Sequence, residues 1–461
     1  MDSITMTTEQ QLPEGWEYAP FNMFFNVVSI SDKKISQKEY LDNGKYPVID
    51  QGNLFIGGYS NDESLILKIS SPVIVFGDHT KCFKYVSFPF VAGADGIKVL
   101  EPQNGIYPKY AYYYCLSIDL TDRGYSRHFA FLKKCQFLIA PLETQQAIVN
   151  KIESLFNEID EGIGRLKTAA QQIQQYRQSL LKNAFNGELT KEWRSKHADT
   201  LPSENELLAQ IQTTREQHHV QQLADWQTAV SQWEQNGKEG KKPSKPKALT
   251  QAVKFEDNFA DLPSGWIWGK LSDLGELARG KSKHRPRNDK KLFGGKYPFI
   301  QTGEVRAANR IIKKYEQTYS EFGLEQSKLW QKGTLCITIA ANIAETAFLG
   351  FDACFPDSIV GFSASKAVLP EYIELFIKSA RTKIESYAPA TAQKNINLNT
   401  LENLIVPYCS LTEQTQIVAI LESKLTACDQ LAAELAKQLK QAELLKQAVL
   451  KAAFSGSLLD K

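Results

Sequence analysis

The side chains best able to do chemistry in this sequence are cationic, and they are densest in one segment of its second half. Eight basic side chains fall between positions 279 and 291: Arg279, Lys281, Lys283, His284, Arg285, Arg287, Lys290 and Lys291. Lysine and arginine bind phosphate, and arginine also pairs with guanine through two hydrogen bonds. We predict a DNA-contacting loop here, with Lys281, Lys283, Arg285, Arg287 and Lys290 as its contacts. A solvated surface loop would have the same composition, and this alternative stays open.

A second candidate combines cations with aromatic rings in the first half of the chain. Residues 125–134 read Tyr-Ser-Arg-His-Phe-Ala-Phe-Leu-Lys-Lys. The corresponding segment of the second half, residues 391–397, holds amides and a cation. Amide and cationic side chains form the hydrogen bonds with which proteins read base edges. The DNA contacts predicted in these two segments are Arg127, Lys133, Lys134, Gln393, Lys394 and Asn395.

One segment matches a nucleotide-binding motif but lacks its context. Residues 275–282, GELARGKS, fit the P-loop pattern GxxxxGK[ST]. That motif needs a buried strand before it and a helix N-terminus after it, so that backbone N–H groups point at phosphate. Pro286 and the cations around it argue against such a helix. We therefore do not expect nucleotide binding, and an enzyme that uses this segment is kept only as a rival hypothesis.

The other reactive residue types form no recognisable active site. The six histidines show no metal-ligand spacing, the seven cysteines include no CxxC pair, and neither a GxSxG motif nor an Asn/Asp-Pro-Pro-aromatic segment occurs. We predict a chain without catalytic residues and without a metal or cofactor of its own. An odd number of dispersed cysteines fits a reducing compartment better than a disulfide framework.

The elements that must position these segments follow from an internal repeat. Four ordered anchors occur twice: LPEGW at 12–16 and LPSGW at 262–266, GKYPVI at 44–49 and GKYPFI at 295–300, Pro-x-Tyr at 108–110 and 370–372, and LIAP at 138–141 with LIVP at 404–407. Residues 145–189 then align without a gap with residues 414–458, and 15 of 45 positions are identical. The chain therefore holds two copies of one arrangement, a domain followed by a helical segment.

Each helical segment carries an apolar stripe with the i, i+4, i+7 spacing of a long amphipathic helix. Gly187 and Gly456 follow the stripes at positions where helix C-termini favour glycine. At 1.5 Å per residue each helix would be roughly 60 Å long, and we expect the two to pack antiparallel. The stripe residues selected are Ile152, Phe156, Ile159, Leu166, Ile173 and Phe185 in the first copy and Leu421, Leu425, Leu435, Leu439 and Phe454 in the second.

The segments before the helices indicate mixed α+β domains of about 140 residues. Short β-rich runs alternate with glycine turns, and one short helix is predicted in each domain, near 110–116 and 372–379. Residues 191–261 are polar, with a helix predicted at about 204–235 and a basic linker at 238–247. We interpret this insert as a solvated connector, with a DNA-binding arm as the alternative.

Composition excludes other classes of protein. The 461 residues are 43% hydrophobic and 23% charged, and no apolar run approaches the roughly 18–20 residues of a membrane span. A net charge of +2 excludes a polycationic tail but not a local basic patch. Residues 1–143 have 13 Lys and Arg against 16 Asp and Glu, whereas residues 262–410 have 20 against 14. The second domain is therefore expected to attract a phosphate backbone more strongly.

The paired LPxGW openings and the two helices that close on LKxAFxGxL resemble the DNA-specificity subunits of type I restriction–modification systems. The resemblance covers nearly the whole chain. It implies an α+β fold of two globular mixed α/β target recognition domains joined by two long antiparallel coiled-coil-like helices, with an internal pseudo-twofold repeat. The implied divisions are recognition domains at 1–143 and 262–410, spacer helices at 144–190 and 411–461, and the insert at 191–261.

The same resemblance implies a function in complex with other subunits. Each recognition domain would read one half of a split, asymmetric double-stranded DNA target. The stripe residues of the spacer helices would dock two methyltransferase (M) subunits, and motor–nuclease restriction (R) subunits would join them. S-adenosylmethionine, ATP and Mg would be bound by those partners, and the non-catalytic chain would lie in a bacterial or archaeal cytoplasm, away from membranes. An orphan DNA-binding or regulatory protein of the same fold is the alternative.

Overall fold

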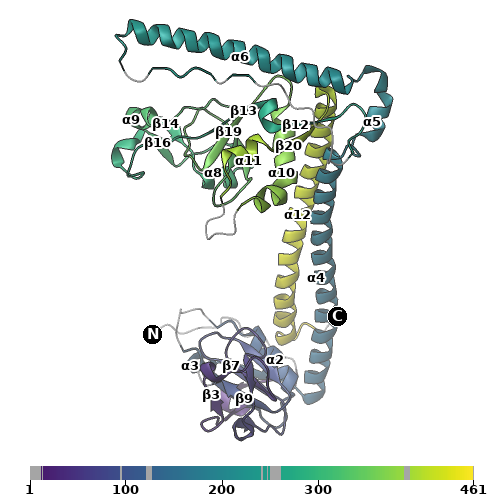
Figure 1. Cartoon of the computed structure of the whole chain (residues 1–461). Helices are drawn as coiled ribbons and strands as arrows, with labels where there is room; N and C mark the ends of the chain where they lie inside the picture. The colour runs from purple at the N-terminus through teal and green to yellow at the C-terminus, as the bar shows by residue number, and fades with distance from the viewer. Residues whose placement is uncertain are drawn as a thin grey trace. The chain divides into compact units, whose positions relative to one another are not determined.

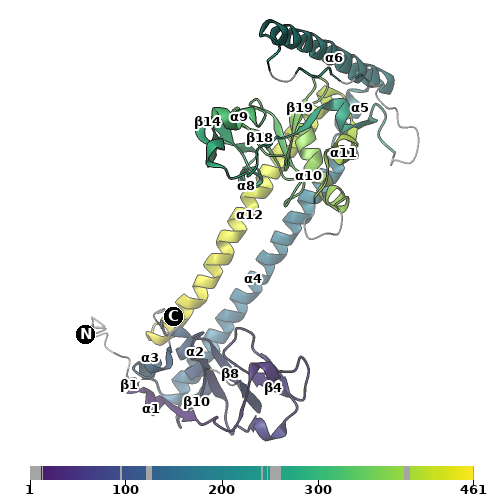
Figure 2. The same cartoon turned by 60° about the vertical axis from the view of Figure 1, so that its left-hand side comes forward.

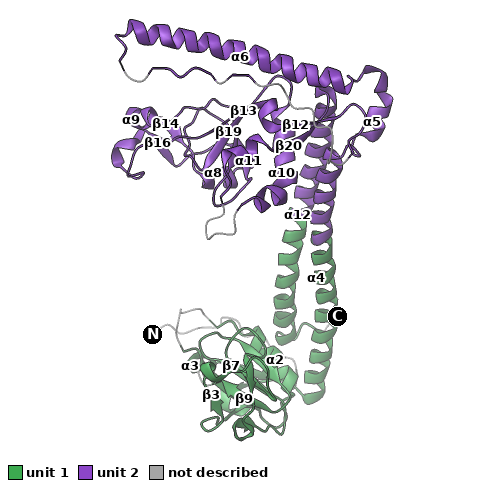
Figure 3. Cartoon of the chain, viewed as in Figure 1, with its two compact units in different colours: residues 1–170, 433–461 green, residues 171–432 purple. Residues whose placement is uncertain are grey.

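The computed structural model of the chain describes residues 12, 14–93, 96–120, 127–239, 242–246, 248–249, 261–388 and 395–459. The chain forms two compact units, which we call unit 1 (residues 1–170 and 433–461) and unit 2 (residues 171–432), shown in Figure 3. Two long helices, α4 (Leu142–Phe185) and α12 (Leu411–Phe454), contribute residues to both units (Figure 1). Each unit therefore combines a mixed α+β domain with parts of the same two helices.

Unit 1 combines small sheets with short helices. Its elements are β1 (Glu17–Pro20), α1 (Phe21–Phe24), β2 (Phe25–Val28), β3 (Lys34–Ile35), β4 (Tyr46–Ile49), β5 (Gly58–Ser60), β6 (Ile66–Leu67), β7 (Val73–Gly77), β8 (Phe83–Val86), β9 (Phe90–Gly93), β10 (Ile97–Pro102), α2 (Pro108–Ser117), α3 (Phe129–Leu132) and β11 (Gln136–Ile139). The central sheet has the strand order β2-β10-β7-β8, and a second sheet has the order β3-β9-β4-β5 with β6 beside β9. β1 pairs antiparallel with β11.

The core of unit 1 is aromatic. Phe24 and Phe137 have no exposed area, and their rings stack with centroids 4.8 Å apart. The end of α12 completes this core, because Phe454 lies edge-on to Tyr114 at 4.9 Å and Val449, Leu450 and Ala453 are buried beside it. Burying one large apolar side chain contributes about 1.5–3 kcal/mol. The last turns of α12 are therefore part of what stabilises unit 1.

Unit 2 repeats this arrangement and adds to it. Its elements are α5 (Lys191–Lys196), α6 (Glu204–Gln235), β12 (Ile267–Lys270), α7 (Leu271–Leu274), β13 (Gly275–Arg279), β14 (Phe293–Phe299), α8 (Thr302–Ala307), β15 (Ile311–Ile312), β16 (Gln317–Tyr319), α9 (Glu321–Glu325), β17 (Leu335–Thr338), β18 (Thr346–Leu349), β19 (Ile359–Ala364), α10 (Pro370–Ser386), α11 (Leu398–Glu402) and β20 (Ile405–Tyr408). The central sheet has the order β13-β19-β17-β18-β15, β12 pairs with β20, and β14 pairs with β16. Phe185 of α4 enters the core and lies edge-on to Tyr372 at 5.2 Å.

The single short helix predicted for each domain is only part of the helical content. α2 and α10 lie where the sequence predicts them, and α10 continues to Ser386. The domains also contain short helices that the sequence analysis missed: α1 and α3 in unit 1, and α7, α8, α9 and α11 in unit 2. Helices of four to six residues are too short to show a helical hydrophobic period.

The repeat in the sequence is also a repeat of structure. β1-α1-β2 in unit 1 corresponds to β12-α7-β13 in unit 2, and in both units the last of these strands lies at one edge of the central sheet. Gly15 and Gly265 have φ values of +80° and +79°, in the left-handed region that glycine tolerates best. This conformation explains the glycine in both LPxGW turns.

One predicted anchor is wrong by three positions. The sequence pairs LIAP at 138–141 with LIVP at 404–407. In the structure Tyr18 of β1 faces Leu138, whereas the equivalent Trp268 of β12 faces Pro407. Leu138 therefore corresponds to Pro407, and the phenols of Tyr110 and Tyr372 donate to these two carbonyls at 3.0 and 2.7 Å. Both tetrapeptides are apolar strand segments, and apolar composition alone does not define a register.

The two long helices run antiparallel within each unit, as predicted (Figure 2). In unit 1 Lys446 of α12 pairs with Asp160 in the first half of α4 at 2.5 Å. In unit 2 Arg177 near the end of α4 pairs with Asp429 of α12. The predicted glycines follow the helix ends, since Gly187 and Gly456 have φ values of +80° and +83° after helices that end at Phe185 and Phe454.

A buried glutamine at the start of each long helix joins that helix to its domain. Gln145 accepts a hydrogen bond from the backbone of Tyr107 at 2.7 Å and donates to the carbonyl of Ala140 at 2.8 Å. Its counterpart Gln414 accepts from the backbone of Leu369 at 2.9 Å and donates to a carbonyl at 2.8 Å. Tyr107 and Leu369 are the N-cap residues of α2 and α10. The side chains thus satisfy buried backbone groups, whose unpaired state would be costly.

Candidate nucleic-acid interface

The cationic segment of the second domain connects β13 to a short turn of 3-10 helix at Lys290–Leu292. Asp357 organises one side of this connection. Its backbone carbonyl accepts two hydrogen bonds from the Arg279 guanidinium at 2.8 and 2.6 Å, and its carboxylate pairs with Arg287 at 2.8 Å. Arg287, a predicted DNA contact, is therefore partly neutralised within the domain.

A second fixed point of the basic loop is an imidazole–carboxylate pair. Nε2 of His284 lies 2.8 Å from the Asp289 carboxylate, which also accepts a hydrogen bond from the backbone of Lys291 at 3.0 Å. The backbone hydrogen bond from Lys291, with that from His284, holds the pKa of Asp289 below its usual value. The guanidinium of Arg285 is turned onto the carbonyls of Ser282 and His284, at 2.6 and 2.9 Å. The loop is thus a defined turn and not a loose tether.

Lysines are the cations that this loop leaves available. Lys281, Lys283, Lys290 and Lys291 are exposed, and within the described part of the chain none of their ammonium groups forms an ion pair within 4.0 Å of a carboxylate. The backbone beneath them is held, because the Ser327 hydroxyl donates to the Lys281 carbonyl at 2.9 Å and the Lys283 backbone donates to Gln326 at 3.2 Å. Four ammonium groups on a braced loop form a surface to which phosphate groups would be attracted.

The P-loop-like segment has the wrong structure for that motif. Residues 275–279 form strand β13, which pairs antiparallel with β19 at the edge of the central sheet. The residues from 280 to 289 are all described, and none of them lies in a helix. Without a helix N-terminus, the backbone N–H groups are not gathered around a phosphate site. The segment therefore does not have the strand–loop–helix geometry of a P-loop.

The aromatic–cationic segment of the first domain is docked on the turn after β7. The backbone of buried His128 donates to the Asp78 carbonyl at 2.9 Å, and the backbone of Phe129 donates to the Asp78 carboxylate at 2.7 Å. Lys133 lies over the Phe129 ring, 4.9 Å from its centroid. Arg127, Lys133 and Lys134 are exposed. All three predicted cations are thus available to a ligand beside this turn.

The equivalent place in the second domain is only partly described. Gln393 and Lys394, two predicted contacts, lie outside the described residues. Asn395 is exposed and forms an isolated bridge with Ala340, and the Ile396 backbone donates to the Ile339 carbonyl at 3.0 Å. Ile339 follows β17, the counterpart of β7. In both domains, therefore, the predicted segment joins the loop after the same strand.

Other polar residues at this junction in unit 1 were missed by the sequence analysis. The Thr80 hydroxyl donates to the Gln51 carbonyl at 2.6 Å, and the His79 backbone lies 3.4 Å from the Gln51 side-chain oxygen. A Cβ on Gly96 would lie 2.7 Å from the same oxygen, so the three loops are closely packed. The signals that could have located them are the repeated GKYPVI anchor, which ends just before Gln51, and the Gly77-Asp78 turn.

Three buried cysteines have thiols that are harder to ionise than a free thiol. Burial raises the pKa of the thiols of Cys115, Cys336 and Cys409, the opposite of the change that activates a nucleophile. Within the described ranges, no group of three or more His, Cys, Asp or Glu side chains is placed to hold a metal ion. No helix in those ranges has both the length and the apolar character to cross a membrane.

Comparison with known families decides the identity of the chain. The profile of the family described as "Type I restriction modification DNA specificity domain" matches residues 13–167 and 263–441, more than half of the chain and both copies of the repeat. The chain belongs to this family. Its resemblance to type I specificity subunits, seen in the LPxGW turns and the paired helices, is confirmed.

Individual relatives support the assignment of this specificity subunit. The EcoKI specificity subunit of Escherichia coli K12 is 23% identical over 490 residues, covering 97% of this chain and 90% of that protein. The Escherichia coli EcoR124I/EcoR124II specificity subunit is 36% identical over 83 residues, covering 17% and 20%.

Solved structures support the fold. The HsdS subunit of Thermoanaerobacter tengcongensis has a TM-score of 0.51 at 15% identity and covers 97% of this chain and 98% of its own. A chain from a structure on the complex assembly and conformational transition of the type I R-M system has a TM-score of 0.62 at 15% identity and covers 97% and 99%. The predicted α+β class, with two domains and two long helices, is confirmed.

The stripe residues of the specificity subunit fall into two groups by burial. Ile152, Phe185 and Leu421 are buried in the cores of their units. The others are only partly buried: Phe156, Ile159, Leu166, Ile173, Leu425, Leu435, Leu439 and Phe454. α12 also exposes Leu431, Leu444 and Leu445, each by more than half of its side-chain surface. These leucines leave apolar area on the surface of α12.

The insert of the specificity subunit is anchored to unit 2 by the first half of α6. Leu207 and Ile211 are buried there, and Arg215 pairs with Asp273 at 3.3 Å. The second half of α6 packs against the segment 242–246 that follows it. Trp226 donates from Nε1 to the Pro243 carbonyl at 3.1 Å, and the Lys245 ammonium lies 5.8 Å from the centre of the Trp226 ring. The predicted helix at 204–235 is confirmed, with a capping box of Ser203 and Glu206 at its start.

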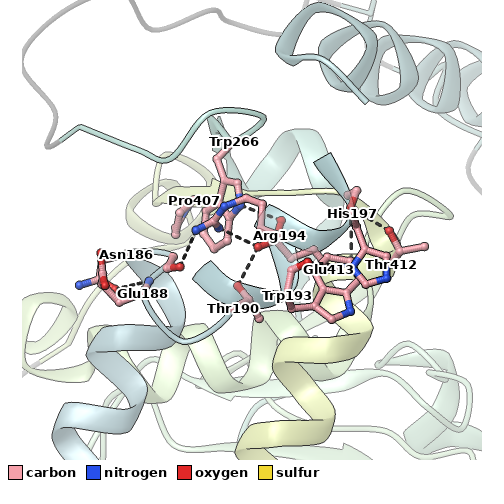
Figure 4. A network of polar contacts seen from close by, with 12 residues as sticks. Asn186, Glu188, Thr190, Trp193, Arg194, His197, Trp266, Pro407, Thr412 and Glu413 are labelled. Atoms are coloured by element: carbon pink, nitrogen blue, oxygen red, sulfur yellow. Dashed lines mark hydrogen bonds and ion pairs between the residues drawn. The ribbon is translucent and has the colours of Figure 1, made fainter. Parts of the chain in front are cut away.

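A buried carboxylate joins the second recognition domain to the first turn of α12 (Figure 4). Glu413 is 1% exposed. It accepts hydrogen bonds from the Thr190 hydroxyl at 2.7 Å, from Arg194 at 2.8 Å and from the Trp266 indole at 2.9 Å. The Arg194 guanidinium also donates to the Gly187 carbonyl at 2.7 Å and lies over the Trp266 ring. The first turn of α12 thus supplies one acceptor to the LPxGW tryptophan, to Thr190 and to Arg194 of α5.

Proposed function

We propose that this specificity subunit reads a split, asymmetric DNA target, one half with each recognition domain, and that α4 and α12 dock two methyltransferase subunits. The observation that carries the proposal is the repeat itself. One chain presents two equivalent strand–loop junctions, each beside predicted DNA contacts. Two recognition domains of similar fold but different sequence are suited to two different half-sequences. The similar faces of α4 and α12 are suited to two copies of one partner.

The chemistry of the complex is assigned to the partner subunits in this proposal. The chain itself would be non-catalytic, the methyltransferase subunits would bind S-adenosylmethionine and methylate adenine, and the motor–nuclease subunits would use ATP and Mg. Partly buried and exposed leucines along α12 support a role in docking. The exposed lysines between 281 and 291 support contact with the DNA backbone.

Assembly is the direct test of this function. The full chain is mixed with a type I methyltransferase subunit from the same organism, and the mass of the complex is measured by size-exclusion chromatography with light scattering. We expect two methyltransferase copies per chain and adenine methylation at one split sequence in genomic DNA. A chain that binds DNA but no methyltransferase would instead support an orphan DNA-binding or regulatory protein.

Exchange of one domain is expected to change one half of the target. Residues 12–141 are replaced by the same segment of another specificity subunit. This segment contains the first recognition domain but ends before the long helix α4. Methylated adenines are then mapped by long-read sequencing. The half-sequence read by the second domain should be unchanged. A change in both halves would refute the modular interpretation.

Lengthening both helices is expected to lengthen the unread gap between the half-sequences. One heptad is inserted into α4 and one into α12 at aligned positions, which adds about 10 Å to each helix at 1.5 Å per residue. About 10 Å corresponds to roughly three base pairs of B-DNA at 3.4 Å per step. We expect methylation to shift to targets with a gap longer by about that amount, and an unchanged gap would mean that the helices do not set it.

A further inference from the structure

Glu153 and Glu422 occupy equivalent positions of the repeat. Each is followed by serine, and each belongs to one of the identical pairs in the alignment of residues 145–189 with 414–458. Glu153 lies on α4 and Glu422 on α12, and both are partly exposed, at 33% and 43% of the side chain. Core packing therefore does not explain why both copies have glutamate here.

In unit 1, Glu153 receives contacts from the recognition domain. The Lys109 ammonium of α2 pairs with its carboxylate at 2.6 Å, and the Tyr113 hydroxyl of the same helix donates to the same oxygen at 3.3 Å. The hydrogen bond to Glu153 raises the pKa of Lys109. Tyr113 also lies edge-on to Phe156 of α4, with ring centroids 5.8 Å apart. One face of α2 is thus fixed on one turn of α4.

In unit 2, Glu422 receives its cation from a different element. Arg310, which precedes β15, donates from Nη1 to Glu422 and from Nε to Glu374 of α10 at 3.1 Å. The backbone carbonyl of Arg310 accepts a hydrogen bond from Phe348 of β18 at 2.8 Å. One residue therefore connects the central sheet, α10 and α12.

The backbone at Arg310 indicates that its side chain has a specific role. Its φ is +68°, in the left-handed region that only glycine, asparagine and aspartate enter readily. Glycine would adopt this turn without strain but would have no guanidinium to span Glu374 and Glu422. Strain of this kind persists where surrounding contacts hold the residue in place.

We propose that Glu153 and Glu422 are positioning residues that fix the orientation of each recognition domain on its spacer helix, and so set how strictly the gap between the half-targets is measured. The inference rests on the proposed function. Partly exposed ion pairs add little to stability, but a charge-assisted hydrogen bond restricts the angle between the elements that it joins. The two domains supply different cations from different elements to the same helix position, which points to a shared requirement for orientation.

The test compares DNA targets that differ only in the gap between the half-sequences. Once the methylated sequence is known, duplexes are made with the natural gap and with one base pair fewer or more. The complete complex is prepared with wild-type chain, Glu153→Gln or Glu422→Gln. We expect each variant to lower the preference for the natural gap by about two- to fivefold, the range that one partly exposed ion pair can produce. The measurement is the rate of adenine methylation of each duplex. If a variant lowers this rate equally at all three gaps, the glutamate has a merely structural role and the proposal is overturned.

Matched controls and a rescue separate orientation from loss of charge. Among the described residues, Glu161 on α4 and Glu434 on α12 pair only with residues of their own helix, so Glu161→Gln and Glu434→Gln should keep the wild-type preference. The reversed pair Lys109→Glu with Glu153→Lys should recover more of the preference than either single reversal. Absence of any recovery would contradict the proposal. A wild-type complex that methylates no split target would overturn the proposed function itself.

Discussion

Replacing Glu413 with alanine is expected to destabilise unit 2 by about 3–5 kcal/mol, the usual cost of removing one partner of a buried ion pair. The substitution would leave Arg194, whose side chain is 14% exposed, without its carboxylate, and would leave the buried Trp266 indole without an acceptor. An unpaired buried donor bears its full desolvation cost. Urea unfolding followed by hydrogen exchange measures the effect and assigns it to a unit.

The location of the Glu413→Ala effect is as informative as its size. Amides of unit 2 around β12 and the start of α12 should lose protection, because Thr190, Arg194 and Trp266 all belong to that unit. Amides of the aromatic core of unit 1 should keep theirs. Glu434→Ala on the same helix removes an exposed carboxylate and should change stability by less than about 0.5 kcal/mol. An equal effect of the two substitutions would mean that the network does not hold the domain.

Replacing Lys281, Lys283, Lys290 and Lys291 with glutamine is expected to weaken DNA binding and to reduce its dependence on salt. The slope of log K against log[salt] is negative, and each lost phosphate contact lowers its magnitude by about 0.9. If all four lysines contact phosphate, raising salt from about 50 to 200 mM lowers the affinity of both complexes for DNA. The fold-loss should be about 100 times larger for the wild-type complex than for the variant. Titration of labelled duplexes at several salt concentrations measures this slope.

The DNA sequence should matter little to the lysine effect. Phosphate contacts carry no base information, so target and non-target duplexes should lose affinity to a similar extent. The fourfold replacement with arginine keeps the charge and should keep the slope. Arg287→Gln should have a smaller effect than a lysine replacement, because Arg287 already pairs with Asp357. An unchanged slope in the glutamine variant would exclude this loop from the DNA interface.

Periodicity made the helices predictable and left the sheets unresolved. The stripes of α4 and α12 extend over many turns, so their existence and their glycine ends could be predicted, as could α6. The pairing of LIAP with LIVP was wrong because strand register depends on long-range partners. Tyr18 and Leu138, for example, face each other across 120 positions of sequence. A local sequence pattern cannot predict such a contact.

In the candidate interface, too, local sequence predicted some features, and others depend on residues far apart in the chain. Composition was enough to find the lysines of the basic loop, because they lie close together in sequence. It could not show that Arg287 is paired, since Asp357 lies 70 residues away in the chain. It could not find Gln51 or His79 either, because folding alone brings these residues to the junction. The helical repeat did identify Glu153 and Glu422 as equivalent, but not the cations that bind them.

Unit 1 is built from two separate segments of the chain, and this affects the order in which the two units fold during synthesis. Unit 2 is one continuous segment, residues 171–432, whereas unit 1 needs residues 433–461 as well. Val449, Leu450 and Ala453 complete its aromatic core. Domains commonly fold in the order of their synthesis, the N-terminal one first. Here the domain that is translated first must wait for the last turns of α12, and the domain that is translated second can finish before it.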